Sequence, residues 1–220
     1  MIENLDVRVV VFSLRDEQLQ VLLRPATEPD KWELPGCPLT QDISLDEAAA
    51  RSIRHFTGLR DPYLEQLYTY GDAGRLDHGQ RLISVAYIAI LPVKAGAGAS
   101  SALSKDEQAP QWFPAGSLPT LAGDHGDVIS YALRRVRYKL EYTAIGFQLL
   151  PEAFSLSELQ NVYEMILGER LDKRNFRRRI LQAGIIEETS TLRAGEGRPA
   201  RLYRYRPDAV AEIKARRLFP

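Results

Sequence analysis

Short runs of apolar residues, separated by polar turns, predict that the first half of the chain is rich in β-strands. Residues 6–13 and 18–24 hold mostly branched and long apolar side chains, and a polar turn separates them, so we predict a β-hairpin. Later segments of the same character predict further strands at residues 62–71, 80–92 and 109–113. By contrast, four prolines interrupt residues 25–43, which predicts a long irregular loop of the kind that often carries function.

Two segments of this half repeat their apolar residues at helical spacing. The first is predicted to begin after Ser44, with Glu47 placed to complete a capping box, and to end at Gly58. The second covers residues 124–139, where apolar side chains recur every three or four positions. The first half therefore combines a sheet with two helices.

In the second half the pattern changes to helices. Ser155 and Glu158 form another capping-box pattern, and Gly168 is expected to stop the helix that follows. After a short turn, Asp172 is expected to cap a further helix that ends at Gly184. Two helices joined by a tight turn, the second of them basic, predict a helix-turn-helix, which places its second helix in the major groove of DNA.

A hairpin is predicted after these helices, and we call it the wing. Residues 185–189 predict its first strand, and residues 200–206 predict its second, in which apolar or aromatic residues alternate with arginines. Glycines and a proline between them predict the turn. A basic wing suits contact with phosphates or with the minor groove.

The second helix of the motif divides into an apolar side and a basic side. Phe176, Ile180 and Leu181 are spaced to pack inward. Arginine can read guanine and asparagine can read adenine through paired hydrogen bonds. Together with the wing, the outward side chains give a predicted DNA-binding set: Lys173, Arg174, Asn175, Arg177, Arg178, Arg198, Arg201, Tyr203 and Arg204. The alternative is a helix and hairpin that form only a solvated basic surface.

Charge divides the chain in the same way as the patterns do. The 220 residues carry 29 Lys+Arg and 29 Asp+Glu, a net charge of zero. Residues 1–133 hold 11 basic against 18 acidic side chains, whereas residues 134–220 hold 18 basic against 11 acidic ones. This asymmetry indicates a basic module that meets a polyanion, although two domains can also simply differ in surface charge.

The remaining composition excludes several classes of protein. The single cysteine, Cys37, rules out an intrachain disulfide and a site built from several cysteines. No apolar run approaches the length of a membrane span, and the first residues lack the basic start of a signal peptide. We therefore expect a cytoplasmic protein.

One stretch of the first half resembles the signature of the Nudix hydrolases. The segment Trp32-Glu33-Leu34-Pro35-Gly36, followed by Arg51 and by Gly58, reproduces the spacing of the family pattern G-x5-E-x7-R-E-x-x-E-E-x-G without a gap. The resemblance covers roughly residues 5–140. It implies a Nudix-like α/β/α sandwich, in which the motif lies on a loop, a helix and a second loop.

The departures from this signature concern its chemistry. The positions of the first glycine and of the four glutamates hold Cys37, Ile43, Ser52, His55 and Phe56. Nudix hydrolysis needs several carboxylates on one helix face to hold Mg²⁺ and to align water. We therefore expect no catalytic residues, no metal and no hydrolase activity. Three acids lie near the helix start, where they more simply complement the helix dipole: Asp42, Asp46 and Glu47. Rescue of some activity by carboxylates remote in the sequence stays an open alternative.

A Nudix-type pocket without metal can still bind a nucleotide. Arg24, Arg51 and Arg54 are candidate phosphate ligands, and Trp32 and Tyr70 are candidate stacking partners for a base. Each has a simpler alternative, because a tryptophan often packs in a core and Arg51 can pair with an acid of its own helix. The three histidines are scattered along the chain, which argues against a zinc site.

The second half resembles a more specific family. The pairs Leu150-Pro151, Tyr163-Glu164 and Leu167-Gly168, with residues 171–178 and 197–203, are similar to the C-terminal domain of the Nudix-related regulators of NAD metabolism, the NrtR family. The resemblance runs over the entire chain. It implies an α+β fold class, a Nudix-like sandwich followed by a winged helix-turn-helix, with an effector-sensing domain at residues 1–140 and a DNA-binding domain at residues 141–220.

The same resemblance implies a function. It implies a homodimeric repressor on a palindromic operator of NAD biosynthesis or salvage genes, with ADP-ribose or a related nucleotide as effector and with no cofactor. Relatives of this architecture that control sugar catabolism leave the regulated genes open. Two other classes also stay open: an active ADP-ribose pyrophosphatase with an accessory nucleic-acid-binding domain, and an adaptor whose basic half binds RNA or an acidic partner.

Overall fold

The computed structural model describes residues 4–60, 62–77, 79–92, 109–140, 143–193 and 199–209. It divides into two compact units. The first comprises Met1–Arg15 and Leu19–Leu133, and the second comprises Asp16–Gln18 and Arg134–Pro220. The helix α2 (His125–Leu140) supplies residues to both units. Within the described residues, no helix is long and apolar enough to cross a membrane.

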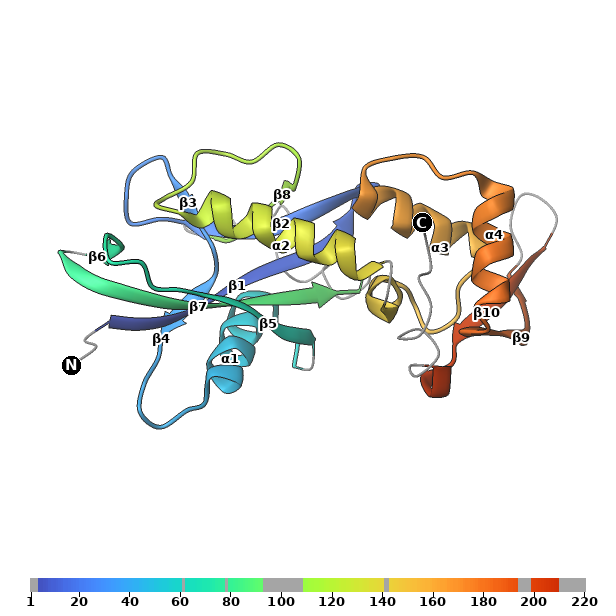
Figure 1. Ribbon diagram of the computed structural model, residues 1–220, viewed down its shortest axis with the longest axis horizontal. Coiled ribbons are helices and arrows are strands. Elements are labelled where there is room, and N and C mark those ends of the chain that lie inside the picture. Colours follow the sequence, from blue (N-terminus) through green and yellow to red (C-terminus); the bar gives the residue numbers. More distant parts are fainter. Residues whose placement is uncertain are drawn as a thin grey trace. The chain divides into compact units, whose positions relative to one another are not determined.

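The first unit is built on an eight-stranded mixed sheet (Figure 1). Its main path runs β3-β2-β1-β7-β5, in which β1 and β7 pair in parallel and β5 and β7 pair antiparallel. The long strands are β1 (Asn4–Arg15), β2 (Gln18–Pro25), β5 (Tyr63–Tyr70) and β7 (Gln80–Leu91). The short ones are β3 (Trp32–Glu33), β4 (Gly36–Pro38), β6 (Leu76–Asp77) and β8 (Gln111–Pro114).

The predicted first hairpin is confirmed, and its turn has the backbone that a tight hairpin requires. Strands β1 and β2 are hydrogen-bonded neighbours. Between them, Asp16 and Glu17 both adopt positive φ, at 48° and 56°. Two successive positive φ values mark a two-residue turn whose twist matches that of the strands it joins.

The prediction of an irregular loop over residues 25–43 is wrong in part, because the loop contains β3 and β4. Strand β4 pairs antiparallel with β1 through Asp6↔Pro38, Val7↔Cys37 and Arg8↔Gly36. The approach is so close that a Cβ on Gly36 would lie 2.4 Å from the carbonyl oxygen of Val7. Strands of two or three residues show no alternating pattern, so this pairing is set by tertiary contact and glycine rather than by periodicity.

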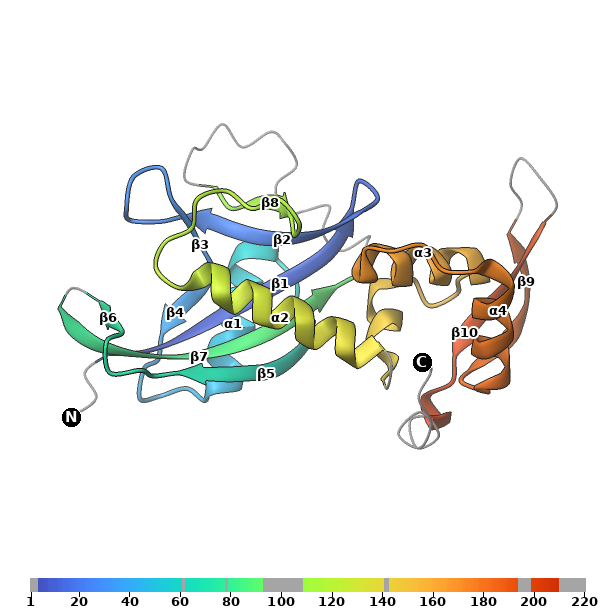
Figure 2. The same ribbon diagram turned by 45° about the horizontal axis from the view of Figure 1, so that its top comes forward.

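Helices cover both faces of the sheet (Figures 1 and 2). The helix α1 (Leu45–Thr57) packs through Ala48, Ala49 and Ile53 on one face. The strand residues beneath it are Val7, Val9, Val11, Val85, Tyr87, Ala89 and Leu91. On the other face, α2 begins with buried Val128 and Ile129. The result is the layered arrangement that was expected, with helices on both faces of a central sheet.

The cap of α1 is half of the expected capping box. The Ser44 hydroxyl accepts the N–H of Glu47 at 3.2 Å, as predicted, and Gly58 ends the helix at φ 75°. The Glu47 carboxylate, however, accepts from Arg51 at 2.7 Å. An i,i+4 pair on the helix surface therefore takes the carboxylate that the box would use.

The second unit holds three further helical segments before its hairpin: η2 (Ala144–Leu149), α3 (Leu156–Leu167) and α4 (Lys173–Gln182). Both halves of the Ser155–Glu158 capping box are present. The Asp172 carboxylate caps α4 by accepting the N–H of Asn175 at 2.7 Å. Helix α4 ends at Gln182, two residues before the expected glycine, with Ala183 as its C-cap.

The wing consists of β9 (Ile186–Arg193) and β10 (Ala200–Tyr205), followed by the short η3 (Pro207–Ala209). Strand β9 extends four residues beyond its predicted end. A bridge between Phe154 and Tyr203, with backbone hydrogen bonds of 2.9 and 2.7 Å, joins the wing to the segment before α3. Aromatic and branched side chains form the core of this unit: Phe154, Leu159, Tyr163, Ile166, Phe176, Ile180 and Leu202.

One packing prediction for α4 is wrong. Phe176 and Ile180 are buried as expected, but the Leu181 side chain is 49% exposed. Successive residues of a helix point about 100° apart, so the neighbour of a fully buried Ile180 turns away from the core.

Candidate functional site

A cleft lies where β2, β4 and α1 approach one another. Two adjoining cavities, of about 610 and 430 Å³, share Arg24, Gly36, Cys37, Pro38 and Thr40. We call their joint space the cleft. Each of the two volumes is in the range of small-molecule sites, roughly 300–1,000 Å³.

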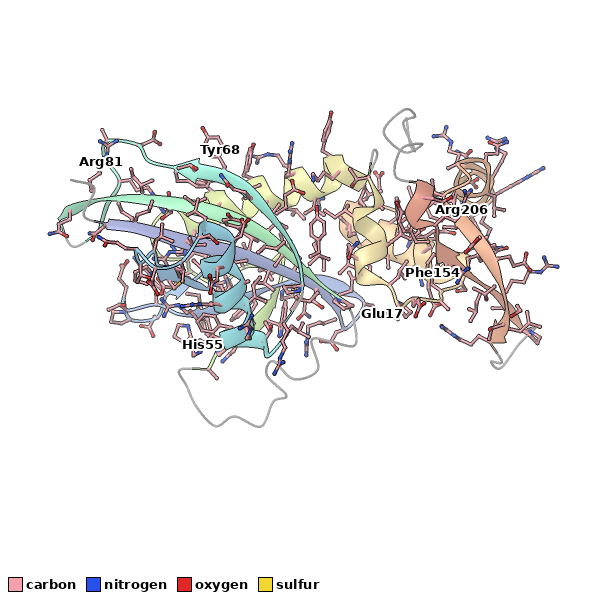
Figure 3. All side chains as sticks on the ribbon, turned by 90° about the horizontal axis from the view of Figure 1, so that it is seen from below. Glu17, His55, Tyr68, Arg81, Phe154 and Arg206 are labelled. Carbon is pink, nitrogen blue, oxygen red and sulfur yellow. The ribbon has the colours of Figure 1, made fainter. Side chains whose placement is uncertain are left out.

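The wall that α1 contributes carries the degenerate signature positions. On this side the smaller cavity is lined by four residues of α1, Arg51, Ser52, His55 and Phe56, and by Ile43, which precedes the helix. The ring of His55, which Figure 3 shows on α1, meets that of Phe56 edge-on at 4.7 Å. None of these five side chains offers a carboxylate oxygen.

The acids near the start of α1 have other partners. Asp46 accepts the hydroxyl of Tyr87 at 2.6 Å, and burial together with this bond raises the pKa of that tyrosine. Glu47 pairs with Arg51. A hydrogen bond from Thr40 lowers the pKa of the exposed Asp42. Over the ranges that the structure describes, no three His, Cys, Asp or Glu side chains come together as a metal site would require.

The cleft arginines are held by carboxylates. Glu33 pairs with Arg24, and Arg8 contacts Asp6 at 2.5 Å and Glu33 at 3.7 Å. The Arg24 Nε is buried and has no hydrogen-bond partner within the described residues. The cleft thus presents guanidinium groups, which suit an anionic ligand able to accept hydrogen bonds.

Of the five predicted effector residues, the structure brings Arg24 and Arg51 together and leaves three apart. Arg54 is exposed on α1 and lines neither cavity. The Trp32 ring packs edge-on against Phe113 at 4.7 Å, as its alternative interpretation held. Of the predicted effector residues, only Arg24 and Arg51 therefore lie where both can contact a ligand in the smaller cavity.

Tyr70 stands on β5 in an aromatic group. Its ring contacts that of Tyr68 at 5.2 Å, and the Arg75 guanidinium carbon lies 6.0 Å from its centre. Burial, reinforced by the neighbouring Tyr131, raises the pKa of Tyr70 to about 12. Tyr70 lines neither part of the cleft.

Sequence reasoning missed Arg8 and a buried polar network beside it. The hydroxyl of Ser84 donates to Asp6, and Arg75 donates to Ser84 at 2.5 Å. Arg75 also binds the carboxylate of Asp124 at 2.7 and 3.0 Å. The only signal in the sequence is the charged pair Asp6 and Arg8 within an otherwise apolar strand.

A second candidate site is the surface of α4. Lys173, Arg174 and Arg178 are exposed, and Arg178 donates to the Asn175 amide oxygen at 2.8 Å. Arg177 reaches back to the hydroxyl of Ser157 at 3.0 Å. Within the described part of the chain, none of the basic side chains of α4 forms an ion pair with an acid.

The arginines of the wing are arranged differently. Arg201 pairs with Glu188 at 3.0 Å, and Arg204 pairs with Glu187. The other two described pairs are Arg193 with Glu158 and Arg206, labelled in Figure 3, with Asp208. Tyr203 is half-buried. The predicted Arg198 lies outside the described residues.

Comparison with known proteins finds relatives of both halves of the chain. The family model described as the NrtR DNA-binding winged helix domain matches residues 146–205. The ADPR responsive transcriptional repressor NtrR of Acinetobacter baylyi is 38% identical over 206 residues, which are 90% of this chain and 80% of that protein.

Solved structures agree over nearly the full length. NrtR of Shewanella oneidensis, complexed with a 27mer DNA, superposes with a TM-score of 0.81 at 33% identity, covering 94% of this chain and 95% of that one. A MutT/nudix family protein from Enterococcus faecalis has the same fold, with a TM-score of 0.71 at 23% identity over 92% of this chain and 88% of that one. The predicted fold class, a Nudix-like domain followed by a winged helix, is confirmed.

Proposed function

The chain belongs to the NrtR family, and from this premise we propose that it is a transcriptional repressor that releases its operator when ADP-ribose or a related nucleotide binds. The observation that carries the proposal is the basic face of α4, which has no acidic partner among the described residues and lies within the segment that the winged-helix family model matches. The relative from Acinetobacter, described as an ADPR responsive repressor, supports the choice of effector.

The DNA-binding part of the proposal assigns base reading to α4 and backbone contact to the wing. Residues 141–220 form the DNA-binding domain, in which Lys173, Arg174, Asn175, Arg177 and Arg178 face the major groove. Arg198, Arg201, Tyr203 and Arg204 contact the backbone. A homodimer would match a palindromic operator, because two-fold symmetry in the protein mirrors symmetry in the site.

The sensing part of the proposal concerns residues 1–140. Arg24 and Arg51, which both line the smaller cavity, bind the diphosphate through hydrogen bonds from their guanidinium groups. The other three predicted effector residues line neither cavity, and in this proposal they contribute only at the periphery of the effector site: Arg54, Trp32 and Tyr70. The effector weakens DNA binding only if it binds the DNA-incompetent arrangement more tightly. The regulated genes would be those of NAD biosynthesis or salvage. The protein itself would act in the cytoplasm.

We also propose that this domain does not hydrolyse its ligand. Ile43, Ser52, His55 and Phe56 line or border the place where carboxylates would hold Mg²⁺. With ADP-ribose and Mg²⁺ or Mn²⁺, AMP should stay at background. Turnover at ordinary enzyme rates, roughly 1 per second or more, would favour the pyrophosphatase alternative instead.

The test of the regulator begins with genomic DNA. Fragments retained by the protein are sequenced to give the operator, and its affinity is then measured with and without ADP-ribose while metal is chelated. We expect a palindromic site, bound tightly alone and weakly with ADP-ribose. Binding that depends on salt but not on sequence would contradict the proposal and favour a general nucleic-acid adaptor.

A further inference from the structure

We propose that His125 is a positioning residue for the cleft, which it shapes by holding the backbone of the segment Trp32–Gly36. We call this segment the lip. The inference rests on the proposed function, because it takes the cleft to be the effector site. It concerns a residue that neither touches the cleft nor belongs to the Nudix signature.

The contact that carries the inference is a hydrogen bond from backbone to side chain. The N–H of Leu34 donates to Nδ1 of His125 at 2.8 Å, 91 residues away in sequence. Leu34 lies between β3 and β4, so its N–H is in neither strand, and its side chain is fully buried. His125 is itself only 7% exposed. A buried N–H that loses its acceptor is costly, so the imidazole fixes the lip at this point.

Residues of the lip on either side of Leu34 line the cleft. Glu33 precedes it and pairs with Arg24, while Gly36 follows closely and lines both cavities. A shift of the Leu34 peptide would therefore move the carboxylate that orients Arg24. His125 acts on the ligand site through Leu34 and Glu33.

This bond is one of three hydrogen bonds that join the lip to residues 120–125. The N–H of Trp32 donates to the carbonyl of Thr120, and the N–H of Ala122 donates to the carbonyl of Trp32, both at 2.9 Å. His125 is the only side chain among the three acceptors. Three residues after Ala122, the same run of chain begins α2 at His125. The hydrogen bond between Leu34 and His125 thus connects the lip directly to the first residue of α2.

The imidazole is in the correct state for this role. Burial lowers the pKa of His125 to about 4, and the nearby charge of Arg8 adds to the effect. The ring is therefore neutral at physiological pH. Because Nδ1 accepts, the single ring proton lies on Nε2.

Two substitutions of similar size separate the acceptor from the bulk of the side chain. His125→Leu removes the acceptor, whereas His125→Asn can place its amide oxygen near the position of Nδ1. We measure ADP-ribose affinity by calorimetry and operator affinity without ADP-ribose. We expect His125→Leu to weaken ADP-ribose binding by about tenfold or more, as an unpaired buried N–H would predict, and His125→Asn to restore it to within about threefold. Operator affinity should stay near the wild-type value in both.

The outcomes separate this inference from the proposed function. If the wild-type protein binds no ADP-ribose, the proposed effector is wrong and the inference is overturned with it. If the wild type binds but His125→Leu binds equally well, only the inference is overturned. Equal losses in the Leu and Asn variants would also overturn it, because the acceptor would then not matter.

A measurement on the wild-type protein covers the case in which His125→Leu does not fold. Hydrogen exchange at the Leu34 amide is followed with and without ADP-ribose. We expect strong protection in the free protein and slower exchange, by about tenfold or more, once the cleft is filled. Rapid exchange in the free protein, or no change on binding, would overturn the inference.

Discussion

The basic side chains of α4 and those of the wing differ in whether acids already hold them. On α4, Lys173, Arg174 and Arg178 have no acidic partner within the described residues. On the wing, Arg201 and Arg204 each pair with a glutamate of the neighbouring strand. The basic side chains of α4 are therefore available to a phosphate without competition from an acid among these residues, whereas those of the wing are partly neutralised by neighbouring glutamates.

This difference teaches that a count of basic residues does not give the strength of a DNA-binding surface. A phosphate that approaches Arg201 must compete with Glu188 and is also repelled by it. Exposed ion pairs of this kind contribute only about 0–1 kcal/mol, so the competition weakens wing contacts without abolishing them. We infer that α4 supplies most of the discrimination and that the wing supplies an attenuated grip.

The largest expected effect is on α4. Arg174→Ala or Asn175→Ala should weaken operator binding by about 1–3 kcal/mol and relax the preference at a defined base. Asn175 must first release Arg178 before it can read a base, so Arg178→Ala should cost less than Asn175→Ala. Competition between operator duplexes with single base changes measures both quantities. Unchanged base preference in the Arg174 and Asn175 variants would show that another element reads the sequence.

A smaller effect of opposite sign is expected when a wing acid is neutralised. Glu188→Gln should strengthen binding to every duplex by up to about 1 kcal/mol and increase the salt dependence, because Arg201 is released to meet phosphate. Glu169→Gln, which removes the same charge from the exposed turn after α3, serves as the matched control. Equal effects of the two substitutions would mean that net charge alone is responsible.

The smallest expected effect is that of Arg201→Ala in the wild-type background. Because Arg201 is already paired, its loss should weaken binding to all duplexes by about 0.5 kcal/mol or less. In the Glu188→Gln background, the same change should cost more and lower the salt slope by about one. Binding at several salt concentrations gives the double-mutant cycle. A change in base preference would instead assign sequence reading to the wing.

Features set by neighbouring residues could be predicted from the sequence. The Ser155–Glu158 box and the Asp172 cap need only a few consecutive residues, and both form as predicted. The Nudix spacing likewise identified Arg51 and the positions that line the smaller cavity.

Features that depend on strand register or on contacts between distant segments could not be predicted from the sequence. The pairing of Arg201 with Glu188 depends on a hairpin whose register shifts between Arg201 and Tyr203. The bond between His125 and Leu34 joins segments that no local pattern relates. Leu181 was misassigned because a three-residue apolar pattern does not fix where the buried stripe ends. Each of these depends on the tertiary structure, which side-chain periodicity does not encode.

Both compact units contain part of α2, and this limits where the protein can be divided into separate domains. The two compact units part after Leu133, in the middle of this helix, while Val136 and Leu140 near its end are buried. A cut at that point would divide α2 into two pieces, each shorter than the roughly 12 residues below which an isolated helix is only marginally stable. The sensor and the DNA-binding part are therefore not interchangeable cassettes: a chimera that joins either to a foreign partner has to carry the whole of α2 and a graft point beyond it.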